Sequence, residues 1–154
     1  MELKFRNISA YRAIKEVYSH PKSWNFLMTF IDDSEEVEID EDSGEIIFVF
    51  TNGKSDKNNY FTNENEYWWI GGYDNGKLAF LQLMHKVSKR HLELVIAQKK
   101  SSSKCKEWFD SLVKYLRQSY EFKYMTTYPM NEKLKEHYIA SGFYECKDEL
   151  RLDI

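Results

Sequence analysis

The sequence predicts a single α/β (α+β) domain over residues 1–154, with a mixed, mostly antiparallel central sheet flanked by helices. Three observations lead to this class. The chain has 154 residues, which is enough to enclose one hydrophobic core. Helical periodicity marks residues 9–33 and 104–120, and turn-punctuated β-rich runs lie between and after them. The nearly continuous apolar run at 92–97 is typical of a strand in the centre of a sheet.

The N-terminal region is predicted to form a short strand and two amphipathic helices. Alternating apolar residues indicate a strand over 3–8, and Ser9 is a suitable N-cap for the helix that follows. Pro21 ends this helix because proline cannot continue it. A second helix is predicted from Ser23 to Asp33, with its apolar residues on one side.

The middle of the chain is predicted to consist of strands. Strands are expected at 37–39 and 46–50, followed by a polar, Asn-rich loop at 54–66. An extended segment resumes at Tyr67. Asn75-Gly76 then suits a two-residue type I′ turn into a strand over 77–84, since both residues tolerate positive φ.

The C-terminal half alternates strands and helices. After the central strand at 92–97, three serines precede a helix whose apolar residues extend from Cys105 to Tyr120. A strand is predicted at 122–127, then a helix from Asn131, and a final strand over 143–152.

Composition and charge exclude several functional classes. The formal net charge of −3 lacks the basic excess expected of a nucleic-acid-binding protein, so we expect no nucleic-acid partner. No apolar stretch is long enough to span a bilayer, and the N-terminus lacks the apolar core of a signal peptide. We therefore expect a cytoplasmic protein with no membrane partner. The abundance of Lys, Asn, Tyr and Ile suggests a bacterial or phage origin. Cys105 and Cys146 have no ligand spacing that would predict a metal site.

The most informative segment is 131–143, Asn-Glu-Lys-Leu-Lys-Glu-His-Tyr-Ile-Ala-Ser-Gly-Phe. Asn131 is a good N-cap and follows Pro129, so a helix is expected to begin there. Leu134 and Tyr138 share one face of this helix because they are four residues apart. Gly142 provides the left-handed residue that ends many helices.

This segment resembles the C-terminal motif of the GNAT N-acetyltransferase family, which reads Asn, two residues, Ala, three residues, Tyr, three residues, Gly-Phe. The resemblance implies that Tyr138 protonates the departing thiolate of coenzyme A and that the turn at Asn131 lies along the pantetheine arm. Leu134 replaces the usual Ala, and His137 replaces an aliphatic residue. The order of strands and helices from Tyr67 onward also matches the GNAT order, which implies a V-shaped opening between the central strand and its parallel neighbour.

The sequence departs from the family at the pyrophosphate loop. GNAT enzymes have a loop with the pattern Arg/Gln, two residues, Gly, one residue, Gly/Ala, whose N–H groups surround the pyrophosphate. Here residues 98–106 read Gln-Lys-Lys-Ser-Ser-Ser-Lys-Cys-Lys, without glycine. One alignment begins the motif at Gln98. The other, which we prefer because it keeps the apolar helix positions in register, begins it at Ser101. The residues expected to hold the phosphates are Ser101, Ser102, Ser103, Lys104 and Lys106.

A carboxylate on the central strand is the first candidate for the general base. Glu93 would remove a proton from the ammonium group of the acceptor, with His85 and His91 as alternatives. The ordinary role of such a carboxylate is a salt bridge at the end of a strand. By resemblance, the backbone around Val95 and Ile96 would bond to the thioester and the pantetheine.

Together these features predict an acetyl-CoA-dependent N-acetyltransferase that acts by direct transfer on a small amine or a peptide amine, as a monomer or homodimer. The alternative is a catalytically inactive GNAT-fold binding or regulatory module that no longer binds acetyl-CoA. The missing glycines favour this alternative, and Asn131 with Tyr138 favours the enzyme.

Overall fold

The computed structural model describes residues 3–34, 36–39, 46–49, 66–100, 107–129 and 132–153. The described helices are α1 (Ala10–Ser19), α2 (Asn25–Ser34), α3 (Trp108–Ser119) and α4 (Glu132–Ala140). The described strands are β1 (Leu3–Ile8), β2 (Glu36–Ile39), β3 (Ile46–Val49), β4 (Tyr67–Asp74), β5 (Lys77–Lys86), β6 (His91–Lys99), β7 (Tyr124–Thr127), β8 (Tyr144–Cys146) and β9 (Glu149–Asp153). Residue 50 of the predicted strand over 46–50 and residues 54–65 of the predicted loop lie outside the described residues.

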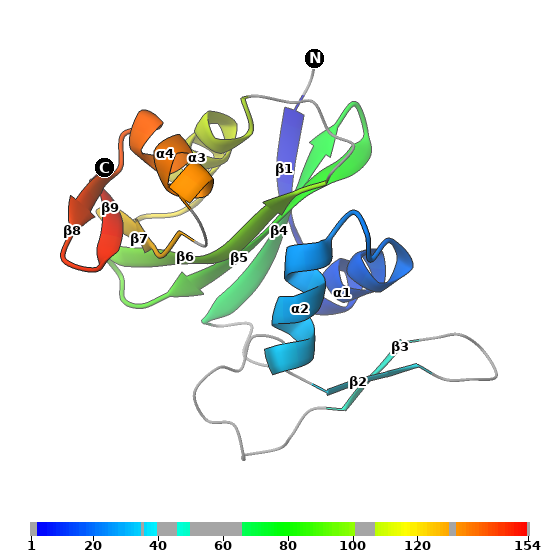
Figure 1. Cartoon of the computed structure of the whole chain (residues 1–154). Helices are drawn as coiled ribbons and strands as arrows, with labels where there is room; N and C mark the ends of the chain where they lie inside the picture. Colours follow the sequence, from blue (N-terminus) through cyan, green and yellow to red (C-terminus); the bar gives the residue numbers. More distant parts are fainter. Residues whose placement is uncertain are drawn as a thin grey trace.

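One seven-stranded sheet organises the molecule (Figure 1), in the order β1-β4-β5-β6-β7-β9-β8. Every neighbouring pair in it is antiparallel except β6 and β7, which are parallel. Strands β2 and β3 form a separate antiparallel pair. The predicted α/β class with a mixed, mostly antiparallel sheet is therefore confirmed.

Local sequence signals account for the boundaries of several elements. The Ser9 side chain accepts a hydrogen bond from the Arg12 N–H, as expected of the N-cap of α1. Between β4 and β5, Asn75 has φ 51° and Gly76 has φ 83°. A type I′ turn requires these two positive angles, and this explains why Asn-Gly closes the predicted hairpin here.

The C-terminal strand prediction was wrong in one respect. The segment predicted as one strand over 143–152 forms a hairpin of β8 and β9, paired from Tyr144 with Arg151 to Cys146 with Glu149. Lys147 turns the chain with φ 59°. Lysine is not a usual left-handed residue, so the sequence lacks the Gly or Asn that would signal this turn.

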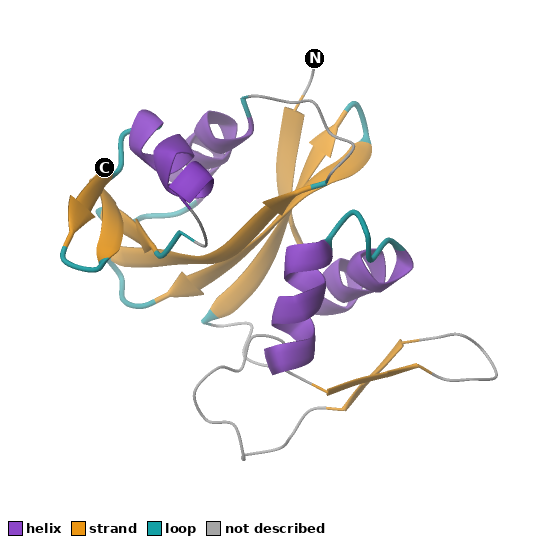
Figure 2. Ribbon diagram, in the orientation of Figure 1, coloured by secondary structure: helices purple, strands orange, loops and turns teal. Residues whose placement is uncertain are grey.

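The helices form two layers on opposite faces of the sheet, called below the α1/α2 face and the α3/α4 face (Figure 2). The buried core on the α3/α4 face includes Met84, Leu92, Leu94, Phe109, Leu112, Leu116, Met125, Tyr138 and Leu150. The core on the α1/α2 face includes Ala13, Ile14, Val17, Trp24, Leu27, Ile31, Trp69, Leu83 and Ile96. In the part of the chain that the structure describes, no helix is both long and apolar enough to span a membrane.

The central strand β6 is not buried on both faces along its whole length. Leu92 and Leu94 point into the α3/α4 core, whereas His91, Glu93 and Val95 are only partly buried. Residues Ile96 to Gln98 are buried. The first half of β6 therefore presents side chains on its second face that remain accessible.

Candidate functional site

Tyr138 is a core residue of the α3/α4 face. Only 1% of it is exposed, and its ring packs against Phe109, with centroids 4.8 Å apart, and against Phe143, at 5.5 Å. Burial raises the pKa of the Tyr138 hydroxyl well above its ordinary value, opposed in part by a hydrogen bond with the side chain of Thr127. The phenol therefore stays protonated through neutral pH.

The end of α4 fixes the position of Tyr138. The Phe143 N–H donates to the Tyr138 carbonyl at 3.1 Å, and the Gly142 N–H donates to the Ile139 carbonyl at 3.1 Å. These two bonds form a Schellman motif, in which Gly142 has φ 108°. The prediction that Gly142 ends this helix is confirmed. Asn131, the predicted N-cap, lies outside the described residues.

Thr127 connects Tyr138 to the junction of β6 and β7. Its hydroxyl donates to the Leu94 carbonyl at 2.9 Å. Leu94 and Thr127 are also the last pair in the β6/β7 register, because β7 ends there while β6 continues to Lys99. Tyr138 thus reaches, through one hydroxyl, the point where the two parallel strands cease to pair.

A β-bulge in β6 lies directly beyond this junction. Leu83 pairs with Ile96 and Met84 pairs with Leu94, so Val95 has no partner in the β5 register. It has none in the β7 register either, since that pairing ends at Leu94. Bulges of this kind leave the backbone of the extra residue unpaired and redirect it. The backbone at Val95 is therefore suited to bond a ligand, as the family resemblance implies.

Glu93 lies on the α1/α2 face, opposite Tyr138, in a cross-strand row that we call the Glu93 row. Directly paired residues place Tyr67, His85, Glu93, Thr126 and Arg151 side by side on one face of the sheet. The Glu93 carboxylate Oε1 is 3.2 Å from His85 Nδ1, with 27% of the Glu93 side chain and 22% of the His85 side chain exposed. Glu93 is thus a partly exposed carboxylate next to the strand junction.

His91, one of the two alternative bases, has a different environment. Its Nε2 is 2.6 Å from the Thr126 hydroxyl, and its ring stacks on Tyr124 with centroids 4.5 Å apart. Burial lowers the pKa of His91, against the opposing effect of Glu149. His91 is therefore held by structural contacts on the row next to Glu93.

Gln98 is engaged by α2. Its Oε1 accepts from the Leu27 N–H at 3.0 Å, and its Nε2 donates to Asn25 Oδ1 at 2.8 Å. The side chain is 92% buried. Gln98 thus fixes the first turn of α2, and the alignment that begins the phosphate motif at Ser101 stays a prediction.

The basic segment after β6 is only partly described. Lys100 forms an ion pair with Glu16 of α1 at 3.8 Å, and the same carboxylate accepts from the Trp24 indole at 3.1 Å. Lys100 is thus partly neutralised. The predicted phosphate-binding residues Ser101, Ser102, Ser103, Lys104 and Lys106 lie outside the described residues.

Two functional contacts were not predicted from the sequence, namely the His85–Glu93 pair and the Thr127 hydroxyl at the junction. The first had a detectable signal. The chain turns over 87–91, and each residue before this turn pairs with the residue equally far after it, so Lys86 lies opposite Leu92 and His85 opposite Glu93. The contact of Thr127 had no signal in the sequence, because its partner Leu94 lies 33 residues away.

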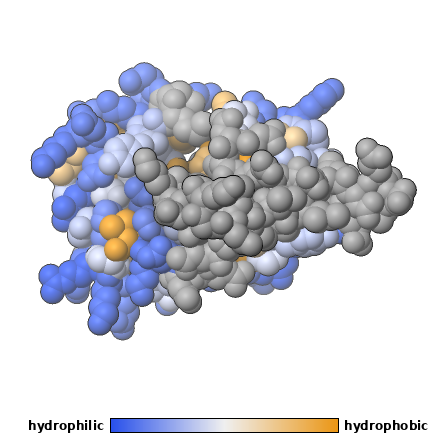
Figure 3. Space-filling model, turned by 90° about the horizontal axis from the view of Figure 1, so that it is seen from below, coloured by the Kyte–Doolittle hydropathy of each residue, from blue (hydrophilic) through white to orange (hydrophobic). Residues whose placement is uncertain are grey.

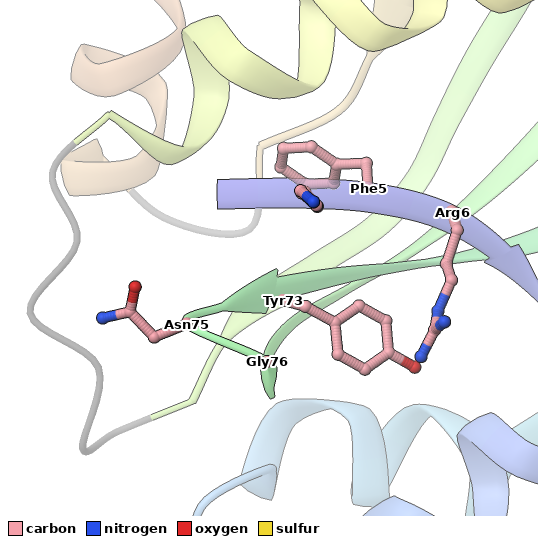
Figure 4. Close-up of a pocket in the computed structure, with 6 residues that line it drawn as sticks. Phe5, Arg6, Tyr73, Asn75 and Gly76 are labelled. Atoms are coloured by element: carbon pink, nitrogen blue, oxygen red, sulfur yellow. The ribbon is translucent and has the colours of Figure 1, made fainter. Parts of the chain in front are cut away.

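A pocket of about 390 Å³, lined by none of these residues, lies beside the β4–β5 turn (Figure 4). It is lined by Lys4, Phe5, Arg6, Tyr73, Asn75 and Gly76. The Arg6 guanidinium lies 4.1 Å from the centre of the Tyr73 ring. The residues that line this pocket include none that the sequence predicts to bind a ligand or to take part in catalysis.

Comparisons with known proteins support the fold. No protein-family profile matches the sequence. No curated protein matches it either. Among solved structures, the PaiA N-acetyltransferase of Thermoplasma acidophilum in complex with coenzyme A is 12% identical, with 100% of both chains covered and a TM-score of 0.58.

Two further structures agree. The Campylobacter jejuni N-acetyltransferase PseH is 10% identical, with 97% of this chain and 94% of that chain covered and a TM-score of 0.54. The GNAT domain of S. lividans PAT is 8% identical, with 62% of this chain and 65% of that chain covered and a TM-score of 0.50. These similarities show that the chain has the GNAT fold.

Proposed function

We propose that the protein is an acetyl-CoA-dependent N-acetyltransferase that transfers the acetyl group directly to a small amine or a peptide amine. The observation that carries this proposal is the arrangement at the β6/β7 junction. Tyr138 reaches the junction from the α3/α4 face through Thr127, and Glu93 lies beside it on the α1/α2 face. A general acid, Tyr138, and a general base, Glu93, on opposite faces of the sheet at this junction suit acyl transfer.

Each of the two side chains has a separate part in the reaction. Acetyl-CoA supplies an acyl group activated as a thioester. Glu93 accepts one proton from the ammonium group of the acceptor, and the neutral nitrogen can then bond to the thioester carbon. Tyr138 donates its proton to the sulfur as the carbon–sulfur bond breaks. The nitrogen then loses its second proton to solvent, and the Tyr138 phenolate takes up a proton from solvent.

The cofactor would be held by backbone and by the polar segment after β6. The N–H and carbonyl groups at Val95 and Ile96, which lie at the β-bulge, are proposed to bond the thioester and pantetheine. Ser101, Ser102, Ser103, Lys104 and Lys106 are proposed to hold the pyrophosphate by hydroxyl, N–H and ammonium groups, and Asn131 to lie along the pantetheine. A helix N-terminus attracts anions without requiring glycine.

The acceptor is proposed to be an amine because the surroundings of Glu93 are acidic and polar. Burial, with Glu66 and Glu93, raises the pKa of Tyr67, and a hydrogen bond with Glu149 raises the pKa of Tyr128, so these carboxylates lie near the two tyrosines. Seen from below, the visible described surface is mostly hydrophilic, with small apolar areas (Figure 3). A cationic acceptor suits such surroundings.

A second function is favoured by one specific observation. The segment 98–106 contains no glycine, and Lys100 is already paired with Glu16. Side chains at the usual glycine positions would obstruct close approach of backbone to phosphate. The alternative is therefore a GNAT-fold binding or regulatory module that has lost acetyl-CoA binding.

Titration calorimetry with acetyl-CoA, and with coenzyme A in parallel, separates the two functions. We expect micromolar binding, about −8 kcal/mol, for the enzyme. Lys104→Ala together with Lys106→Ala should weaken binding, whereas Lys133→Ala on α4 serves as a matched control. No heat and no thermal shift with either ligand would reject the enzyme and support the binding module.

A further inference from the structure

Three side chains from three successive strands form a contact chain that ends at Glu93. Tyr67 of β4 pairs directly with His85 of β5, and His85 pairs directly with Glu93 of β6. The rings of Tyr67 and His85 stack with centroids 4.2 Å apart and planes 11° apart. Tyr67 is 93% buried, so it provides a fixed surface for the histidine ring.

The hydrogen bond from His85 restricts the orientation of the carboxylate. An ionised carboxylate can only accept hydrogen bonds, so the contact between Glu93 Oε1 and His85 Nδ1 requires the proton on Nδ1. Among the described residues, Oε2 of Glu93 has no hydrogen-bond partner. One oxygen is therefore held by the protein, and the other remains available to an acceptor.

We propose that His85 is a positioning residue for Glu93: stacked on Tyr67, it donates from Nδ1 to Oε1 and so directs Oε2 toward the amine. The catalytic consequence rests on the proposed function, but the pairing does not. Free rotation of the carboxylate would place either oxygen, or neither, near the acceptor nitrogen. A fixed orientation increases the rate, because misplacement of a base by about 1 Å can cost about 100-fold.

The pairing can be measured without any substrate. Nitrogen-15 NMR of the full-length protein at pH 8 reports which ring nitrogen of each histidine carries the proton, and His85→Asn identifies the His85 signals by their loss. We expect the Nδ1–H form in the wild type. Glu93→Val should shift His85 to the commoner Nε2–H form and should leave His20, which is remote from the Glu93 row, unchanged. An Nε2–H form in the wild type would overturn the proposal.

The effect on catalysis can be tested with two substitutions that separate the two contacts of His85. His85→Phe keeps a ring that can stack on Tyr67 but removes the donor. His85→Asn removes the ring but places an amide N–H near the position of Nδ1. We expect His85→Phe to lower kcat about tenfold with an unchanged KM for acetyl-CoA, and His85→Asn to recover most of the loss.

The outcomes distinguish this proposal from the proposed function. Equal rates for His85→Phe and the wild type, or an equal loss in both variants, would overturn the positioning role. If the protein transfers no acetyl group, the proposed function fails, and the NMR measurement alone decides whether His85 orients Glu93. Circular dichroism and thermal unfolding verify that both variants are folded.

Discussion

The two sides of the β6/β7 junction differ in how tightly they are packed. On the α3/α4 face, Tyr138 is enclosed by Phe109 and Phe143, and 1% of it is exposed. On the opposite face, Glu93 is 27% exposed and has a polar neighbour. Packing accounts for a large aromatic side chain at Tyr138, but it explains little about Glu93. The two residues should therefore respond differently to substitution, and the following experiments test that difference.

The largest effect is expected from removing a ring on the packed side. Phe109→Ala should lower the free energy of unfolding by about 3–5 kcal/mol, because it leaves a cavity between Tyr138 and Phe143. Tyr124→Ala, on the opposite face, should cost clearly less, since its ring is only partly buried and stacks on His91. Urea unfolding measures both. Equal losses would contradict the difference between the faces.

The second-largest effect is expected on the rate of acetyl transfer when Glu93 is replaced. Glu93→Gln should lower kcat about 1,000-fold if Glu93 is the general base. Its stability should change by about 1 kcal/mol or less, because the hydrogen bond with His85 is partly exposed. Glu145→Gln removes the charge of a carboxylate that pairs with Lys135 away from the junction and is the control. A rate for Glu93→Gln equal to that of the control would reject the base role.

Tyr138→Phe keeps the packed ring and removes only the hydroxyl. We expect a loss of about 100-fold in kcat from the missing acid and a stability change of about 1 kcal/mol from the lost hydrogen bond. Tyr115→Phe removes a hydroxyl that donates to Asn7 of β1 and should leave the rate unchanged. Wild-type activity in Tyr138→Phe would mean that this tyrosine serves packing alone.

The smallest effect is a pH dependence of stability. The pKa of Tyr138 is raised in the folded state above the unfolded value of 10.0, so the folded phenol keeps its proton while the unfolded one ionises. Stability should therefore fall as pH rises above 10, by about 1.4 kcal/mol for each pH unit from this group. Urea unfolding of the wild type and Tyr138→Phe at pH 9 and pH 11 isolates the contribution of Tyr138 to the free energy of unfolding. An identical decline in stability in both proteins would contradict this prediction.

Much of the fold could be predicted from local signals. Ser9, Asn75-Gly76 and Gly142 each mark a boundary that the structure confirms, because capping and turn formation depend on residues a few positions apart. The hairpin of β8 and β9 was missed, since Lys147 adopts a left-handed angle for which lysine has no preference.

The candidate site was predictable only in part. The family motif indicates Tyr138, and the position of Glu93 on the central strand makes it a candidate base. Periodicity could not show that Gln98 is used to fix α2, because that contact joins residues 71 positions apart. The roles of Asn131 and of the serine and lysine segment remain predictions, because these residues lie outside the part of the chain that the structure describes.

Most elements and their order, and the resemblance to the GNAT family, could be predicted from the sequence alone, because these depend on side-chain periodicity and on short-range turn and cap chemistry. The tertiary structure was needed to show which residues share the junction. The register of β5 on β6 brings His85 to Glu93, and the packing of α4 on the sheet brings Tyr138 to Thr127. The second contact joins residues separated by a helix and a turn, and the burial of hydrophobic surface that holds them together belongs to the whole sheet and its two helical layers.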